Sequence, residues 1–291
     1  MSAMVIATLL WGATFVVVRD SLHALSPVSL VFVRFAAAAV LFAPMVLLRR
    51  RAAGGGLPWR AGIVTGVLTA GAYLFQAIGL TEVRAGTSAF LTSTGTLLAG
   101  WFAWPLLGQR PTRALAAGMA LATFGSALLG GRPDWRLGAG DVWTLIGAAM
   151  YALQIVGVAR WGSRVEPVTL AALQCVVVAV VLAPFAAATP GALARLDGAG
   201  WARLAYLAIA GTMVAPWLQI RAQRALAPGR IGMLFALEPV FGLIMAMTLG
   251  GERFALRWWW GAALIIVAVA WVEWRASHSP PTSPAPNARS A

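Results

Sequence analysis

The sequence predicts an all-α integral membrane protein whose ten transmembrane helices form two inverted repeats of five helices. Three observations lead to this class: the scarcity of charge, a series of long apolar runs, and a pattern that occurs twice. Of the 291 residues, 60% are hydrophobic and 11% are charged, and the mean hydropathy is +0.80. Soluble domains average about 25% charged residues. The chain therefore lacks the polar material to cover a surface in water.

The composition also excludes several kinds of enzyme. All 22 basic residues are arginine, so a phosphate-binding loop of the Walker A type and a Schiff-base lysine are both ruled out. The only histidines are His23 and His278, and the only cysteine is Cys175. These three residues do not supply a metal cluster, a disulfide or a Ser-His-Asp triad. We expect no catalytic residues, no metal and no cofactor.

The formal net charge of +13 does not indicate nucleic-acid binding. That function needs a basic face on a soluble domain, whereas these arginines lie between apolar runs, as in 49–51 and at Arg110 and Arg113. Short basic loops of this kind orient a protein in the lipid bilayer.

A helix crosses the hydrocarbon core of a bilayer in about 20 residues. Ten apolar runs fit this length, at 3–18, 28–48, 61–81, 85–107, 113–130, 140–159, 167–188, 201–220, 230–250 and 257–274. The first run lacks the basic segment and the cleavage site of a signal peptide, so we expect it to be a retained helix. Residues 276–291 are rich in Pro and Ser and are predicted to be disordered.

Ten spans place both termini on the same side of the membrane. If that side is the cytoplasm, the majority of the arginines face inward, which agrees with the positive-inside rule. We therefore expect a multi-pass protein of the inner membrane with both termini in the cytoplasm.

The two halves of the chain resemble each other. With an offset of 140 residues, later 143, the following positions correspond: Trp11 and Tyr151, Thr14 and Gln154, Pro27 and Pro167, Pro44 and Pro184, and Gln76 and Gln219. Five spans in each half, 1–137 and 138–275, make the second half enter the membrane from the opposite side. Inverted repeats of this kind are typical of secondary transporters, which bind their solute near the midplane. A duplication that only built a stable bundle is the alternative.

Two charged residues lie deep within predicted spans, and a charge at the centre of the bilayer costs roughly 3 kcal/mol or more. Glu238 precedes Pro239, which removes a backbone N–H and can open the helix locally. Arg34 lies in the second span, and the two side chains could approach each other near the middle of the membrane. Glu238 is either a protonatable, solute-facing group or half of a structural ion pair. For Arg34, bracing of neighbouring helices is favoured over a role in coupling or gating.

Uncharged polar and aromatic side chains supply the candidate solute-binding residues. The glutamines and the threonine of the repeat-related pairs could line a cavity or could simply bond helices together. Deep aromatic rings could surround an apolar solute or could pack between helices and lipid. The candidates are Trp11, Thr14, Tyr73, Gln76, Trp101, Tyr151, Gln154, Trp217 and Gln219.

Several segments carry a resemblance to a known family: LLWGATFVVVRD (9–20), SPVSLVFVRFAAAAVLF (26–42), LLGQRPT (106–112), LFALEPVFGLIMAMTLGGERF (234–254) and WWWGAALIIVAVA (258–270). With these segments the chain resembles an EamA-type member of the drug/metabolite transporter superfamily over residues 3–274. The resemblance implies ten helices, cytoplasmic termini, and a central cavity lined mainly by spans 1, 3, 4, 6, 8 and 9. The sequence departs from the family in TSTGTLL (92–98), which lacks the proline found at the matching position 239.

The predicted function is secondary-active transport of a small molecule by alternating access, driven by a proton or solute gradient. Export of amino acids or related small metabolites is implied by the resemblance. The alternatives are an intramembrane enzyme and a lipid-flipping or scaffold protein that transports no solute. The partners expected are the solute and the lipid bilayer, and the chain could be a monomer or a homodimer.

Overall fold

The computed structural model describes residues 1–53, 57–130, 137–161, 164–250 and 256–278, and in these residues every regular element is a helix. The elements are α1 (Ser2–Ser21), α2 (Pro27–Ala53), α3 (Trp59–Leu80), α4 (Ala85–Leu107), α5 (Arg113–Gly130), α6 (Ala139–Trp161), α7 (Pro167–Leu182), η1 (Ala183–Phe185), α8 (Thr189–Leu193), α9 (Gly198–Tyr206), η2 (Leu207–Val214), α10 (Ala215–Ala222), α11 (Pro228–Phe235), α12 (Glu238–Gly250) and α13 (Leu256–His278). The prediction of an all-α protein is confirmed for this part of the chain.

Seven helical segments within the described ranges are long and apolar enough to cross a membrane. They are Ser2–Ser21, Pro27–Leu48, Trp59–Leu80, Ala139–Trp161, Pro167–Phe185, Pro228–Met245 and Leu256–His278, and Arg113–Leu129 is a shorter apolar helix. Helix α4 and the interrupted segment from α9 to α10 occupy two further predicted spans.

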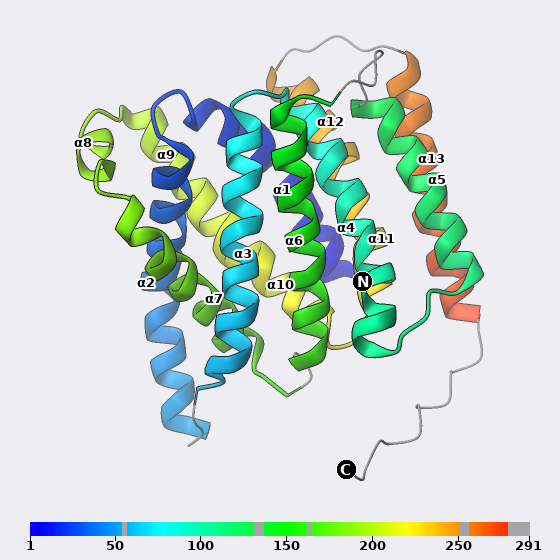
Figure 1. Ribbon diagram of the computed structural model, residues 1–291, viewed down its shortest axis with the longest axis horizontal. Helices are drawn as coiled ribbons and strands as arrows, with labels where there is room; N and C mark the ends of the chain where they lie inside the picture. Colours follow the sequence, from blue (N-terminus) through cyan, green and yellow to red (C-terminus); the bar gives the residue numbers. More distant parts are fainter. Residues whose placement is uncertain (54–56, 131–136, 162–163, 251–255, 279–291) are drawn as a thin grey trace.

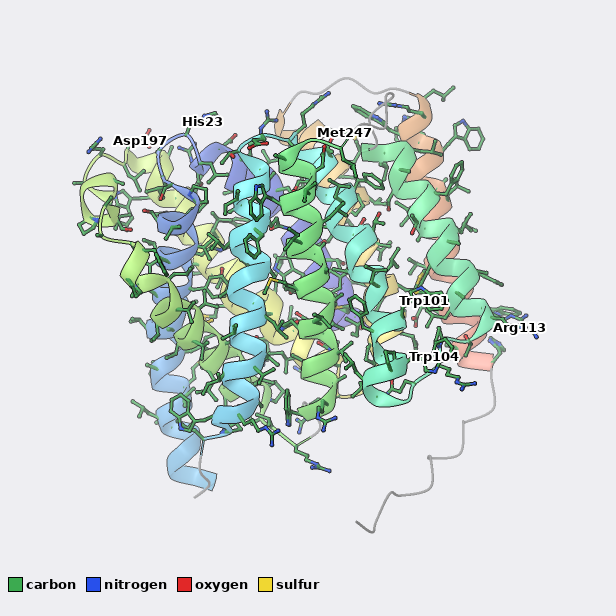
Figure 2. The ribbon with its side chains drawn as sticks, viewed as in Figure 1. His23, Trp101, Trp104, Arg113, Asp197 and Met247 are labelled. Atoms are coloured by element: carbon green, nitrogen blue, oxygen red, sulfur yellow. The ribbon has the colours of Figure 1, made fainter. Side chains whose placement is uncertain are left out.

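The helices form a bundle in which successive long helices run alternately up and down the view of Figure 1. Helices α5 and α13 pack together at one side, and α2 packs on α7 at the other. Between them, α1 packs against α10 and α11–α12, α4 and α6 pack against the α11–α12 segment, and α3 packs on α6 and α7. Figure 2 labels His23 and Asp197 at one end of the bundle, which we call the upper end, and Arg113 toward the other, which we call the lower end.

Local sequence signals explain where helices begin and end. Helix α7 begins at Pro167, where the carboxylate of Glu166 accepts a hydrogen bond from the backbone N–H of Thr169 at 2.8 Å. Asp197 caps α9 in the same way through the N–H of Gly200, at 2.7 Å. At the end of α4, Gly108 adopts φ 71°, a left-handed conformation that favours glycine.

The predicted span 201–220 is not one regular helix. Between α9 and α10 the backbone widens into the π-helical segment η2, where the hydroxyl of Thr212 donates to the carbonyl of Leu207 five residues earlier, at 2.7 Å. A wider turn leaves main-chain carbonyls free to accept bonds from other helices, which is why such segments are frequent at functional sites.

The predicted span 230–250 is also interrupted, between α11 and α12. The N–H groups of Ala236 and Leu237 bond to carbonyls three residues back, and Pro239 has no N–H to continue the regular ladder. Helix α4, which lacks the matching proline, runs unbroken from Ala85 to Leu107. The departure from the family pattern therefore coincides with a difference in bending between these two helices.

Two further predicted boundaries differ. The predicted span 167–188 ends as α7 at Leu182, and the chain tightens into η1 around Pro184. Helix α13 continues to His278, so the start of the predicted tail is helical, and residues 279–291 of that tail lie outside the described residues.

Candidate functional site

A narrow cavity lies in the middle of the bundle. It offers about 30 Å³ of water-accessible space, and about 400 Å³ when its open mouth is included. It is lined by side chains and backbone of α1, α3, α4, α6 and the α11–α12 break. The lining residues are Trp11, Thr14, Phe15, Ala72, Tyr73, Gln76, Thr92, Gly147, Ala148, Tyr151, Phe235 and Glu238. Six of the sequence-predicted site residues are thus brought together: Trp11, Thr14, Tyr73, Gln76, Tyr151 and Glu238.

Glu238 is the one charged residue in this lining. The break after α11 makes it the first residue of α12, and its side chain is only 4% exposed. Its carboxylate oxygen Oε2 is buried and has no hydrogen-bond partner among the described residues. Since a buried charge is costly unless it is paired, this carboxylate is available to a proton or to a cationic group of a solute.

Helix α1 approaches the start of α12 at Gly12. A Cβ atom at Gly12 would lie 2.8 Å from the Cβ of Phe241, 2.9 Å from the backbone nitrogen of Gly242 and 3.1 Å from the carbonyl oxygen of Glu238. Glycine is therefore required for this contact. The close approach fixes the backbone of Glu238 against α1, next to Trp11.

Four aromatic rings form a layer across the middle of the cavity. Trp11 stacks on Phe235 with ring centroids 5.1 Å apart, and Tyr151 meets both rings edge-on, at 6.0 Å from Trp11 and 5.4 Å from Phe235. Tyr73 lies 6.0 Å from Tyr151, at an interplanar angle of 71°. Edge-to-face pairs of this kind are mutually stabilising by about 0.5–1.5 kcal/mol beyond their burial.

Arg34 lies behind this layer and does not line the cavity. Its side chain is 2% exposed, its Nε donates to the hydroxyl of Thr212 at 2.7 Å, and its guanidinium carbon lies 4.9 Å from the centroid of Tyr73. Its Nη2 has no hydrogen-bond partner in the described part of the chain. Arg34 and Glu238 make no ion pair with each other in the described structure, because Tyr73 stands on the cavity side of the guanidinium.

The widened segment η2 is held by two side chains of the first half of the chain. Trp11 donates its indole N–H to the carbonyl of Gly211 at 2.9 Å, and Arg34 bonds to Thr212 next to it. Trp11 therefore has two contacts, with the ring layer of the cavity and with the irregular backbone of η2.

Gln154 and Gln219 are buried below the aromatic layer and do not line the cavity. The hydroxyl of Tyr151 donates to Oε1 of Gln219 at 2.9 Å, and Nε2 of Gln219 lies 3.1 Å from Oε1 of Gln154 and 2.8 Å from Oε1 of Gln223. Gln223 in turn donates to the carbonyl of Ile155 at 2.7 Å. We call Gln154, Gln219 and Gln223 the glutamine cluster.

The remaining two candidates lie away from the cavity. Trp101 on α4 is 44% exposed, and Figure 2 places it on the outer part of the bundle, toward the lower end. Trp217 on α10 is half-buried, with the guanidinium carbon of Arg221 5.9 Å from its ring. Neither ring is in a position to contact a solute in the cavity.

Sequence reasoning missed six lining residues: Phe15, Ala72, Thr92, Gly147, Ala148 and Phe235. Phe15 lies one helical turn after Trp11 on α1. Thr92 lies on α4 and accepts a hydrogen bond from Gln76 of α3 at 3.1 Å. Gly147 lies against α3, where a Cβ would be 2.8 Å from the carbonyl of Ala72. Periodicity along α6 could have found it, since Gly147 precedes Tyr151 by four residues.

Known proteins resemble this chain over nearly its whole length. The profile of the EamA-like transporter family matches residues 1–131 and again residues 138–274. A protein named only as an uncharacterized transporter from Archaeoglobus fulgidus is 27% identical over 270 residues, which cover 93% of this chain and 84% of the relative. The uncharacterized inner membrane transporter YedA of Escherichia coli is 26% identical, covering 91% of this chain and 87% of that protein.

The fold also has a counterpart among solved structures. A crystal structure of a protein of 21% sequence identity superposes with a TM-score of 0.74, and the match covers 96% of this chain and 99% of the other. Together with the apolar helices, the family match and the names of the relatives indicate a membrane transporter rather than an enzyme. The chain belongs to the EamA-like transporter family and is a multi-pass membrane protein.

Proposed function

We propose that this protein is a secondary-active transporter that exports amino acids or related small metabolites across the inner membrane by alternating access. The observation that carries the proposal is a central cavity lined by aromatic rings and by one carboxylate, Glu238, whose Oε2 has no hydrogen-bond partner among the described residues. The mixed aromatic and polar lining suits a small amphiphilic molecule.

The architecture proposed is ten spans in two inverted repeats, 1–137 and 138–275. The packing of the helices supports this architecture, because a contact between two spans is matched by a contact between their counterparts in the other half. Helix α3 packs on α6 as α1 packs on α10 and η2, and α4 packs on α6 as α1 packs on α12. Helices α2 and α7 pack on each other, as do α5 and α13, and each of these is a pair of repeat-related partners.

Alternating access is supported by the different states of the repeat-related polar residues. Gln76 lines the open cavity, while its counterpart Gln219 is bonded inside the glutamine cluster. Helix α6 runs from the upper to the lower end, so Gln154 and Ile155 follow Tyr151 on the lower side. We propose that the glutamine cluster closes the lower side of the path, and that in the opposite-facing state the cluster separates while the cavity above closes.

Glu238 is the proposed coupling group. It is the charged residue of the lining, and the other titratable side chains facing the cavity are the phenols of Tyr73 and Tyr151, from α3 and α6. A carboxylate that exchanges a proton as the cavity changes sides would use a proton gradient to drive the solute. Arg34 has a structural role in this proposal, since its contacts are with η2 and Tyr73.

The orientation proposed has both termini in the cytoplasm. More of the arginines then lie on the cytoplasmic side, and Arg113 is at the lower end of the bundle in Figure 2. The upper end of the bundle would then face the outside. The name of YedA as an inner membrane transporter supports the location.

A thermal-shift screen of the purified protein against small metabolites tests the proposal. A ligand that binds the folded state raises the midpoint of unfolding with its concentration. We expect a solute to give a saturable shift, and the same solute to be taken up by proteoliposomes containing the protein. Scrambling of a labelled lipid without any solute flux would support the lipid-flipping alternative. Absence of both activities, with a correctly folded protein, would contradict the proposal.

A further inference from the structure

The cavity carries a negative group and no positive one. Glu238 is buried, and its Oε2 has no hydrogen-bond partner in the described structure. The buried guanidinium of Arg34 donates its Nε to Thr212 and leaves Nη2 without a partner among the described residues, but it does not line the cavity and lies against the ring of Tyr73, which does. A solute in the cavity can therefore reach a carboxylate but not a guanidinium.

The walls beside this carboxylate are aromatic. Trp11, Tyr73, Tyr151 and Phe235 all line the cavity and contact each other in series, with centroid separations of 5.1 to 6.0 Å. The faces of aromatic rings attract cations, most strongly where water is excluded. The same rings provide apolar area for the body of a solute.

Some of the uncharged donors of the cavity are occupied. The hydroxyl of Thr14 donates to the carbonyl of Trp11 at 2.7 Å, and the amide of Gln76 donates to Thr92 at 3.1 Å. The second N–H of Gln76 and the hydroxyl of Thr92 are neutral donors, and the lining holds no cation to offset the charge of a buried carboxylate. An anionic group would also be repelled by Glu238.

We infer that the solute binds through a protonated amino group placed between Glu238 and the aromatic walls, and that it carries an apolar or aromatic body without a free carboxylate. This inference rests on the proposed function and narrows it. Among compounds related to amino acids, the site favours amines and carboxyl-blocked derivatives over the free amino acids.

Four probes of matched size test the inference on the unmodified protein: 2-phenylethylamine, 2-phenylethanol, 3-phenylpropionate and phenylalanine. The thermal shift of each is measured against concentration in detergent or nanodiscs. A charge-assisted contact with a buried carboxylate is worth about 1.5–3 kcal/mol, which is roughly tenfold or more in affinity. We expect the amine to bind at least tenfold more tightly than the alcohol and phenylalanine, and the carboxylate to give no shift.

Two variants test whether Glu238 causes the preference for the amine over the alcohol. Glu238→Gln should bind the amine and the alcohol with similar affinity. Glu82→Gln, which removes an exposed carboxylate outside the cavity lining, should retain the preference of the wild type. Because the ranking of the four probes is measured on the wild-type protein, the test does not depend on the folding of either variant.

An amine that binds no better than the alcohol, or more weakly than phenylalanine or the carboxylate, would overturn the inference. Preference for the amine that survives in Glu238→Gln would also overturn it. If another class of solute binds and is transported, the inference fails while the proposed transport stands. If no solute of any class is transported by the folded protein, the proposed function itself fails.

Discussion

The indole nitrogen of Trp11 and the carbonyl oxygen of Gly211 are joined by a hydrogen bond of 2.9 Å between residues 200 positions apart. This bond, made by the edge of the indole, joins α1 to the π-helical segment η2. A face of the same indole stacks on Phe235 at the α11–α12 break. One side chain of the first half of the chain thus contacts both interrupted helices of the second half. A movement of η2 or of the α11–α12 break would therefore displace the ring of Trp11, which lines the cavity.

Trp11→Phe should weaken the attachment of η2 while it keeps a ring in the aromatic layer. The carbonyl of Gly211 would lose its donor, at a cost of about 1–2 kcal/mol for a buried group. We expect faster amide hydrogen exchange in residues 207–214 and weaker solute binding. Unchanged exchange in this segment would show that the hydrogen bond does not hold it.

Gly12→Ala should destabilise the protein by about 1–3 kcal/mol, because the new methyl group would overlap the backbone and side chain of α12. The control is Gly86→Ala, since no heavy atom lies within 4 Å of a Cβ at Gly86. Thermal unfolding of both variants in the same detergent gives the comparison. Equal midpoints for the two variants would contradict the close approach of α1 and α12.

Arg34→Lys should lose stability without a change in solute preference. A lysine cannot reproduce both the Nε bond to Thr212 and the planar contact with Tyr73, so we expect a loss of about 1–3 kcal/mol. The measurements are the unfolding midpoint and the ratio of amine to alcohol affinity. A variant of normal stability that loses the amine preference would give Arg34 a direct role in binding.

Gln219→Leu should open the lower side of the path, if the glutamine cluster closes it as proposed. The variant removes the acceptor of Tyr151 and the donor to Gln154 and Gln223. A reporter cysteine at Val158, which is buried one turn beyond Gln154 on α6, would be placed in a Cys175→Ala background. We expect faster alkylation of this cysteine from the lower side. The control Gln76→Leu should not increase that rate, and equal rates in both variants would argue against the gate.

The sequence predicted the helical class and most helix positions because long apolar runs leave few alternatives in a membrane protein. It also indicated the interruption before Glu238, since Pro239 removes a backbone donor. The widening of η2 carried no comparable signal. Gly and Thr are common in transmembrane helices, so Gly211 and Thr212 gave no warning. The segment is bonded to Trp11 and Arg34, which are distant in the sequence.

The composition of the cavity was predicted only in part, for the same reason. Residues of unusual character for a membrane, such as Glu238, Gln76 and Tyr151, could be selected from the sequence. Whether a glutamine lines a cavity or bonds to another glutamine depends on how its helix is positioned along the bundle axis relative to the neighbouring helices. Gln76 and Gln219 correspond in the predicted repeat, yet one faces the cavity and the other is enclosed.

Proton-driven accumulation of a solute by proteoliposomes tests the central claim most directly. The solute is one found by the thermal-shift screen, and accumulation is measured with and without a pH gradient in wild type, Glu238→Gln and Glu82→Gln. The account predicts gradient-dependent accumulation by wild type and by Glu82→Gln, and its loss in Glu238→Gln. Accumulation by Glu238→Gln equal to that of the wild type would contradict the role of the buried carboxylate in the cavity.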